Sequence, residues 1–262
     1  HRKIVVVDGK VAFMGGLNIG DEYLGKDPQM GFWRDTHLQV YGDAVYVLQA
    51  IFFMDWAFVK DESHFRLEED IYFPAHNERE RQFVQIAASG PDSEWEAIMQ
   101  VYFAAVASAT KSVHITSPYF IPDDSILMAI KTAALSGIDV KLILPERPDH
   151  KIVFWATKSY LEELLDAGVK VYLYQRGFIH AKILIVDGIV ASLGTANMDI
   201  RSFYYNFEVN ALIYDNQIVR DLEADFQQDL SESREVTIGE VNNRPFTQRL
   251  KESSARLFSP LL

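Results

Sequence analysis

The sequence predicts an α/β fold in which a mixed β-sheet is flanked by helices on both faces, with two pseudo-symmetric lobes. From about residue 83 onward, short apolar runs typical of strands alternate with longer segments of helical periodicity. In addition, the polar pattern H-x-K-x4-D-x6-G-[GT]-x-N occurs twice, from His1 to Asn18 and from His180 to Asn197. A repeat that preserves only polar residues and glycine indicates two half-sites that face each other across one cleft.

The first lobe is predicted to occupy residues 1–80. A β-branched run, an Asp-Gly pair and a second apolar run predict a hairpin, and a further strand and a long amphipathic helix follow it. The predicted strands cover residues 4–7, 10–14 and 36–41, and the helix covers residues 43–60. The acidic stretch after this helix is interpreted as a solvated loop that leads to the second lobe.

The second lobe is predicted to occupy residues 81–262 and contains the alternating pattern. Its predicted strands cover residues 83–89, 113–117, 140–144, 169–174, 183–186, 189–193 and 207–214. Its predicted helices cover residues 94–111, 125–136, 151–167, 217–230 and 244–258. Gly137 and Gly168 follow two of these helices, as glycine often does at helix C-termini.

One copy of the repeat already indicates its chemistry. His180 and Lys182 are two residues apart beside an apolar strand sequence, so their side chains point to the same face. Gly194 and Thr195 offer a backbone that can approach an anion closely and a hydroxyl group, and Asn197 adds an amide. We therefore predict that these three residues bind substrate phosphate. Two histidines and two lysines that converge on one point suit the chemistry of a phosphate.

The duplicated motif resembles that of the phospholipase D superfamily, in which two H-x-K-x4-D motifs form one active site. The resemblance implies that His1 attacks phosphorus and forms a phosphohistidine. It also implies that His180 protonates the leaving alcohol and then deprotonates the incoming one. The side chains expected to hold the phosphoryl oxygens are Lys3, Lys182, Asn18 and Asn197. No metal or other cofactor is expected, because the lysines supply the positive charge.

The acidic residues receive different roles. Asp8 and Asp187 belong to the catalytic motifs, but they lie at the far ends of their strands. The resemblance implies that they tie down a turn or a neighbouring backbone. Glu208 is the candidate that hydrogen-bonds a catalytic histidine and fixes its tautomer. By the same resemblance, Asp35 is expected to take that role beside His1.

Longer stretches resemble the bacterial cardiolipin synthases within this superfamily. They cover residues 117–123, 148–151, 162–170, 194–203 and 256–262. The resemblance implies a phosphatidyltransferase that converts two molecules of phosphatidylglycerol to cardiolipin and glycerol at a bacterial cell membrane. Because those synthases continue before the first motif, the first lobe is expected to be truncated here. A membrane anchor is expected in the absent part, and the isolated chain is expected to have low activity.

Two residues in these stretches lie outside the repeated motif. Tyr119 follows the C-terminal end of a predicted strand, where α/β proteins gather their binding sites, and is a candidate to line a lipid-headgroup pocket. His150 has no assigned chemistry.

Composition limits the alternatives. The chain has 262 residues, no cysteine and a formal net charge of −12. The absence of cysteine excludes disulfides and thiolate metal sites. Acidic charge disfavours the nuclease members of the superfamily, because binding a phosphate backbone requires a basic surface. Nucleic acid is therefore not expected as a partner, whereas phosphatidylglycerol, cardiolipin and a membrane surface are. Two alternatives stay open, a hydrolytic phospholipase D and an inactive fragment of the synthase.

Overall fold

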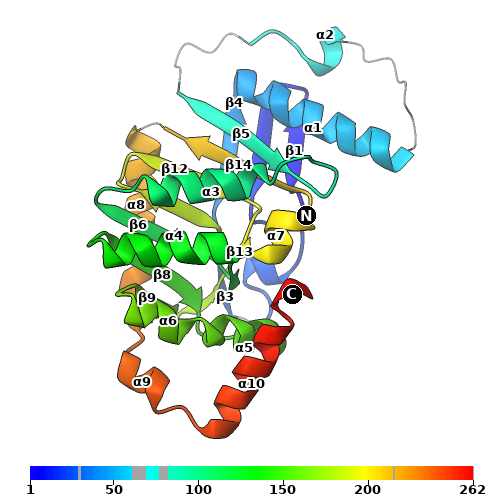
Figure 1. The fold of residues 1–262 in the computed structure, drawn as a ribbon. Helices are drawn as coiled ribbons and strands as arrows, with labels where there is room; N and C mark the ends of the chain where they lie inside the picture. Colours follow the sequence, from blue (N-terminus) through cyan, green and yellow to red (C-terminus); the bar gives the residue numbers. More distant parts are fainter. Residues whose placement is uncertain (29–30, 61–68, 77–81, 215, 262) are drawn as a thin grey trace.

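The computed structural model describes residues 1–28, 31–60, 69–76, 82–214 and 216–261, and it confirms the predicted α/β class (Figure 1). The large sheet of the described part is mixed, with strand order β15-β9-β8-β6-β11-β12-β14-β5. Strands β6, β8 and β9 run parallel to one another, and the other neighbours pair antiparallel. The strands are β5 (Val84–Ser89), β6 (Ser112–Thr116), β8 (Asp139–Pro145), β9 (Lys170–Tyr174), β11 (Ile183–Val186), β12 (Val190–Gly194), β14 (Glu208–Ile213) and β15 (Ser233–Glu235).

Both faces of the middle of this sheet are buried, which explains why β11 is apolar at every position. Helices α3 (Ala97–Ala107) and α4 (Asp124–Leu135) cover one face, and α8 (Asn216–Ser231) covers the other (Figure 1). Along β11, Leu184 packs into the core under α3 and α4, whereas Ile185 packs into the core on the α8 side. Successive strand residues point to opposite faces, so a strand buried on both sides needs an apolar residue at every position.

The first copy of the repeat forms a smaller sheet. Its order is β1-β2-β4, from β1 (Ile4–Val7), β2 (Val11–Gly15) and β4 (His37–Tyr41), and helix α1 (Asp43–Lys60) packs against it. Met14 and Leu48 of this unit belong to the same hydrophobic cluster as Ile185 and Leu193 of the large sheet. The two repeats therefore share a continuous core. The lobe boundary predicted near residue 81 lies outside the described residues, and the division into two lobes stays a prediction.

The turns of the two hairpins have the predicted geometry. Asp8 and Asp187 have φ angles of 53° and 57°, and the following Gly9 and Gly188 have 64° and 65°. Two successive left-handed residues are typical of the type I′ hairpin turn, for which Asp-Gly is a favoured sequence. Each hairpin therefore begins at the same place in its repeat, directly after the His-x-Lys segment.

Several short elements were not predicted from the sequence. They are η1 (Glu22–Leu24), β3 (Phe32–Arg34), α2 (Glu69–Tyr72), β7 (Phe120–Ile121), β10 (Gly177–Ile179), β13 (Met198–Asp199), α7 (Ile200–Tyr204), β15, α9 (Ile238–Asn242) and η2 (Ser259–Leu261). Strand β3 pairs in parallel with β10, and β7 pairs in parallel with β13. These two small ladders hold the segments around the repeated motifs.

The helices otherwise follow the prediction with two differences. The helix predicted over residues 94–111 is shorter, as α3. The helix predicted over residues 151–167 is two helices, α5 (Lys151–Ser159) and α6 (Leu161–Asp166). They are separated at Tyr160, whose backbone nitrogen bonds to the Thr157 carbonyl in a tighter turn. The last helix, α10 (Phe246–Leu257), packs on α5.

Candidate active site

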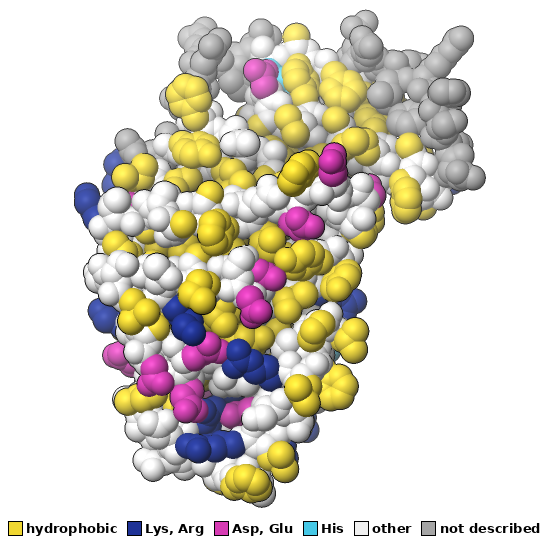
Figure 2. Space-filling model, viewed as in Figure 1, with side chains coloured by type: hydrophobic (Ala, Val, Ile, Leu, Met, Phe, Trp, Pro, Cys, Tyr) yellow, Lys and Arg dark blue, Asp and Glu magenta, His cyan; other side chains and the backbone are white. Residues whose placement is uncertain are grey.

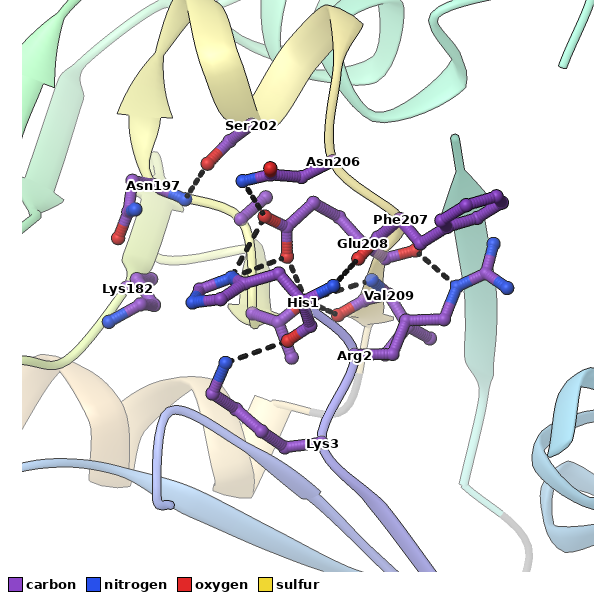
Figure 3. Close-up of polar contacts among 12 residues, drawn as sticks. His1, Arg2, Lys3, Lys182, Asn197, Ser202, Asn206, Phe207, Glu208 and Val209 are labelled. Carbon is purple, nitrogen blue, oxygen red and sulfur yellow. Dashed lines mark hydrogen bonds and ion pairs between the residues drawn. The ribbon is translucent and has the colours of Figure 1, made fainter. Parts of the chain in front are cut away.

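The histidine and lysine of each repeat lie just before the first strand of its hairpin. Lys3 Nζ donates a hydrogen bond to the carbonyl of His1 at 2.7 Å, and Lys182 Nζ donates to the carbonyl of His180 at 2.5 Å. Each ammonium group is thus held beside its own histidine. Figure 3 shows the His1 imidazole between Glu208 and the side of the site that holds Lys182.

The carboxylate that contacts each histidine comes from the other half of the chain. Glu208 Oε1 and Oε2 lie 2.9 Å and 3.1 Å from His1 Nδ1 (Figure 3). Asp35 Oδ2 lies 2.8 Å from His180 Nδ1. The expectation that Asp35 lies beside His1 was therefore wrong, because Asp35 contacts His180.

Two backbone contacts explain this exchange. The His180 nitrogen donates to the Arg34 carbonyl at 2.7 Å, where the parallel β3–β10 ladder ends. In the same manner, the His1 nitrogen donates to the Phe207 carbonyl at 2.7 Å. Each histidine is therefore bonded to the residue that precedes the acidic residue of the other half, which brings that carboxylate to its Nδ1.

The two carboxylates are supported differently. Glu208 is fully buried, and it accepts hydrogen bonds from the Thr195 hydroxyl and, at 3.1 Å, from Asn206 Nδ2. Burial raises the pKa of Glu208, and the Thr195 hydrogen bond opposes that rise. Asp35 accepts from its neighbour's backbone nitrogen and packs against Gly16, which occupies the repeat position of Thr195. A Cβ at Gly16 would come within 2.1 Å of Asp35 Oδ1, so this carboxylate requires glycine there.

Two of the predicted phosphate ligands instead face protein groups. A Cβ at Gly194 would lie 2.3 Å from the Val209 carbonyl, so Gly194 allows close packing on β14. The Thr195 hydroxyl faces Glu208. Contact of either residue with phosphate stays a prediction.

The two motif asparagines have different surroundings. Asn18 Nδ2 donates to the Tyr23 hydroxyl at 2.5 Å. The backbone nitrogen of Asn197 donates to the Ser202 hydroxyl at 3.1 Å (Figure 3). Its side-chain Oδ1 is buried and, among the described residues, accepts no hydrogen bond. A buried polar atom in this state is an expected feature of a site that takes a ligand.

The lysines have lowered pKa values because they are removed from water. Burial lowers the pKa of Lys182 to about 7 and that of Lys3 to about 8. The charges of Glu208 and Asp35 act on both lysines and oppose the shift. Since each lysine senses the carboxylates of both half-sites, the two halves converge on one site. Because the nearby carboxylates do not fully offset the burial of these two lysines, binding of an anion beside them is favoured.

The two histidines differ in exposure. The His1 side chain is 34% exposed, whereas that of His180 is 8% exposed. The rings of Tyr23, Trp33 and Phe178 lie 5.6, 5.3 and 6.1 Å from the His180 ring. Burial and the charge of Lys182 lower the pKa of His180, and Asp35 opposes this. The repeated pattern does not predict this aromatic enclosure, because Tyr23 and Trp33 lie outside it.

The motif aspartates lie away from the histidines, in the hairpin turns. Asp187 accepts hydrogen bonds from the backbone nitrogens of Thr110, Lys111 and Ser112 at 2.7–2.9 Å, and these bonds lower its pKa. It thus fixes the start of β6 to the turn. Asp8 lies in the equivalent turn and has no side-chain hydrogen bond among the described residues.

Neither a metal-binding group nor a membrane span was found in the described part of the chain. No cluster of three or more His, Cys, Asp or Glu side chains there could hold a metal ion. No helix there is both long enough and apolar enough to cross a bilayer.

Comparison with known proteins identifies a family for this arrangement. Residues 102–230 match the family model described as cardiolipin synthase, PLD-like domain. The whole chain is 54% identical to cardiolipin synthase 2 of Bacillus anthracis and 51% identical to the cardiolipin synthase of Staphylococcus aureus. The chain covers 51% and 53% of those two proteins. It thus spans about half the length of the curated relatives that it matches.

Solved structures agree with the predicted phospholipase D-like fold. The chain superposes over its whole length on the phosphatidylserine synthase of Haemophilus influenzae, with a TM-score of 0.73, 17% identity and 71% of that chain covered. It also matches Nuc of Salmonella typhimurium, a phospholipase D family member, with a TM-score of 0.51 and 21% identity. That match covers 60% of this chain and 99% of Nuc. At these identities the likeness concerns the fold.

Proposed function

We propose that this chain, which belongs to the phospholipase D superfamily, carries the catalytic site of a cardiolipin synthase. The reaction is transfer of a phosphatidyl group from one phosphatidylglycerol to another, which yields cardiolipin and glycerol. One observation carries the proposal. Two histidines, each held at Nδ1 by a carboxylate of the other half, share a site with Lys182, which is buried, and Lys3, which is half-buried.

In the first step, His1 acts as the nucleophile. A carboxylate at Nδ1 stabilises the tautomer protonated there, so the Nε2 lone pair of His1 is free to attack phosphorus. The bond between phosphorus and the glycerol oxygen breaks, and protonated His180 gives its Nε2 proton to that oxygen. Glycerol leaves and a phosphatidyl-His1 intermediate remains.

In the second step, the direction of proton transfer reverses. His180 is now neutral and accepts the proton of a hydroxyl group of a second phosphatidylglycerol. That oxygen attacks phosphorus, and the bond to His1 Nε2 breaks. Cardiolipin forms, and both histidines return to their first protonation states. The lowered pKa of His180 suits this basic role, and the negative charge of bound phosphodiester favours its protonation in the first step.

The lysines and asparagines stabilise the charged phosphoryl group. The non-bridging oxygens carry more negative charge in the transition state, and Lys3 and Lys182 lie at the site before substrate arrives. Asn18 and Asn197 are proposed to complete this binding through their amide groups. With two lysines in this role, the proposed mechanism needs no metal ion.

A membrane surface is the proposed environment, because both substrates are lipids. Helix α1 exposes apolar side chains on its solvent face: Val47 is 43%, Met54 60% and Phe58 72% exposed. Figure 2 shows that hydrophobic side chains also occupy much of the viewed face. Exposed apolar side chains of this size favour contact with lipid. We propose localisation at a bacterial cell membrane on this basis.

Hydrolysis is the second candidate function, because the same histidines and lysines would serve a reaction in which water, in place of a lipid hydroxyl group, attacks the phosphohistidine. The product would then be phosphatidic acid in place of cardiolipin.

The test uses the full-length protein with labelled phosphatidylglycerol and separates the products by lipid class. Cardiolipin and glycerol are expected from the wild type and from neither His1→Ala nor His180→Ala. Phosphatidic acid as the main product would support the hydrolase. Absence of any lipid turnover by the wild type would overturn both.

A further inference from the structure

A second polar group lies beside the catalytic residues and has no part in the steps above. The Tyr119 hydroxyl donates a hydrogen bond to Asp149 Oδ2, and the backbone nitrogen of His150 donates to Oδ1 at 2.7 Å. Burial and the adjacent carboxylate raise the pKa of Tyr119, so its phenol stays protonated. The Asp149 side chain is 20% exposed, and each of its oxygens can accept a further hydrogen bond.

Backbone pairing ties this group to the second half-site. Phe120, the neighbour of Tyr119, pairs with Met198 in the β7–β13 ladder, and Met198 follows the motif residue Asn197. The Met198 nitrogen also donates to the Ser117 hydroxyl at 3.0 Å, and that hydroxyl donates to the Tyr119 carbonyl at 2.6 Å. Tyr119 is thereby held next to the phosphate-binding loop.

Tyr23 reaches the same place from the first half-site. Its hydroxyl accepts from Asn18, and its ring stands edge-on to His180 at 5.6 Å. The charge of Asp149 acts on Tyr23, and Tyr23 and Tyr119 are also within electrostatic reach of each other. The indole nitrogen of Trp33, whose ring packs against both Tyr23 and His180, is buried and has no hydrogen-bond partner among the described residues.

The proposed mechanism places an alcohol on this side of the site. An oxygen that exchanges a proton with His180 must lie within about 3 Å of its Nε2. The remainder of that alcohol then extends toward the groups that surround the His180 ring. The leaving alcohol and the incoming alcohol occupy this position in turn, so one subsite serves both.

The chemistry of the subsite selects the alcohol. Phenols both donate and accept hydrogen bonds, and Asp149 accepts them, which suits neighbouring hydroxyl groups. A carboxylate repels an anionic headgroup, and Lys3 and Lys182 oppose an ammonium headgroup. We propose that Tyr23, Tyr119 and Asp149 bind the free hydroxyl groups of a neutral polyol headgroup, such as glycerol, beside His180. This inference rests on the proposed phosphatidyl transfer.

Exchange of the lipid headgroup with free glycerol measures binding at this subsite separately from transfer to water. The full-length protein is incubated with phosphatidylglycerol and labelled free glycerol, and the KM for glycerol is measured from label that enters phosphatidylglycerol. Release of phosphatidic acid is measured in parallel at saturating phosphatidylglycerol, where weaker binding of the leaving glycerol no longer limits formation of the intermediate. Transfer to water needs no polyol subsite after the intermediate has formed. Ethanolamine is offered in place of glycerol to test the headgroup class.

Asp149→Ala is expected to raise the KM for glycerol about tenfold or more, since a hydrogen bond to a charged acceptor is lost. Asp149→Asn and Tyr119→Phe are expected to give smaller increases, with phosphatidic acid release within about threefold of wild type. Asp139→Asn removes a surface carboxylate that pairs with Lys141 and Lys170, and serves as the control with unchanged KM.

An unchanged KM for glycerol in Asp149→Ala would overturn the inference. An equal loss of exchange and hydrolysis in all three variants would also do so, as would a wild type that accepts ethanolamine as well as glycerol. These results differ from failure of the proposed function, in which the wild type would turn over no phosphatidylglycerol at all.

Discussion

Glu208 and Asp35 each place a carboxylate oxygen about 3 Å from the Nδ1 of a histidine. A carboxylate in this position keeps the proton on Nδ1 and directs Nε2 to the substrate. Because the two acids are exchanged between the halves, Glu208 acts on the proposed nucleophile and Asp35 acts on the proposed acid/base. Each acid should therefore affect a different chemical step.

A substrate with a good leaving group separates these steps. Glu208→Gln is expected to lower kcat by about 10²–10⁴-fold, because the amide allows the wrong tautomer of His1. The loss should persist with phosphatidyl-p-nitrophenol. Asp35→Asn should lose activity on phosphatidylglycerol but recover on the nitrophenyl ester, in single-turnover release of nitrophenolate, because that leaving group needs no proton.

The control is Glu223→Gln, which changes a carboxylate 2.9 Å from His114 outside the site. Its rates should stay within about threefold of wild type. If Glu208→Gln, and not Asp35→Asn, recovered activity on the nitrophenyl ester, the assignment of nucleophile to His1 and acid/base to His180 would be reversed.

The lowered lysine pKa values predict a pH dependence of anion binding. Lys182 and Lys3 lose their protons near pH 7 and pH 8 in the free protein. Anion affinity should therefore be complete only below about pH 6 and decrease as the pH rises from 6 to 9, by up to about tenfold per unit for each deprotonated lysine. Sulfate, which does not titrate in this range, serves as the competitive inhibitor.

Lys3→Arg provides the matched comparison, because its charge persists at pH 9. The slope of the inhibition constant for sulfate between pH 8 and 9 should become shallower in this variant. A sulfate inhibition constant that is flat from pH 7 to 9 in the wild type would contradict the account of the lysines.

Among the helices and strands, the sequence predicted those that local patterns along the chain encode. The two Asp-Gly hairpins and helix α1 were predicted with correct positions, because turn chemistry and helical spacing are local. The β3–β10 and β7–β13 ladders were missed. They have two or three residues per strand and join segments far apart in the chain, so no local sequence pattern predicts them.

Those short ladders also explain the error at Asp35. The family resemblance placed Asp35 beside the histidine of its own repeat, whereas β3 carries it across to His180. The types of the site residues were predictable because the repeat preserves them. Their partners were not, since tertiary pairing decides them.

The hairpin turns allow a test of the structural role of the motif aspartates. Asp187→Asn is expected to lower the free energy of unfolding by about 1–2 kcal/mol, because an amide cannot accept all the hydrogen bonds of the carboxylate. Asp8→Asn, in the equivalent turn, should change it by less than about 0.5 kcal/mol. Both variants keep a residue that tolerates the left-handed turn.

The difference in free energy of unfolding between wild type and Asp187→Asn should depend on pH in one direction. The pKa of Asp187 is lowered in the folded protein, so its contribution is complete above the ordinary aspartate pKa of about 3.9 and is lost as the pH falls through the lowered value. Denaturant unfolding at pH 7 and at pH 3 measures it. Equal stability of the Asp187→Asn variant and wild type at pH 7 would exclude the structural role.

At the scale of the whole molecule, the repeat forms one site because the two halves are interlocked. They share a hydrophobic cluster, and each provides the acid for the histidine of the other. The halves are not equivalent, however. His180 is buried among the rings of Tyr23, Trp33 and Phe178, of which Tyr23 and Trp33 lie outside the repeated pattern. This asymmetry fits two different tasks, and the repeated motif alone could not reveal it.

The most direct test is to locate the covalent intermediate. The full-length protein is mixed with labelled phosphatidylglycerol, quenched in alkali, which preserves phosphohistidine, and digested for mass spectrometry. A phosphatidyl or phosphoryl adduct is expected on His1 of the wild type and is expected to be absent from His1→Ala. An adduct on His180, or turnover with no adduct on either histidine, would contradict this expectation.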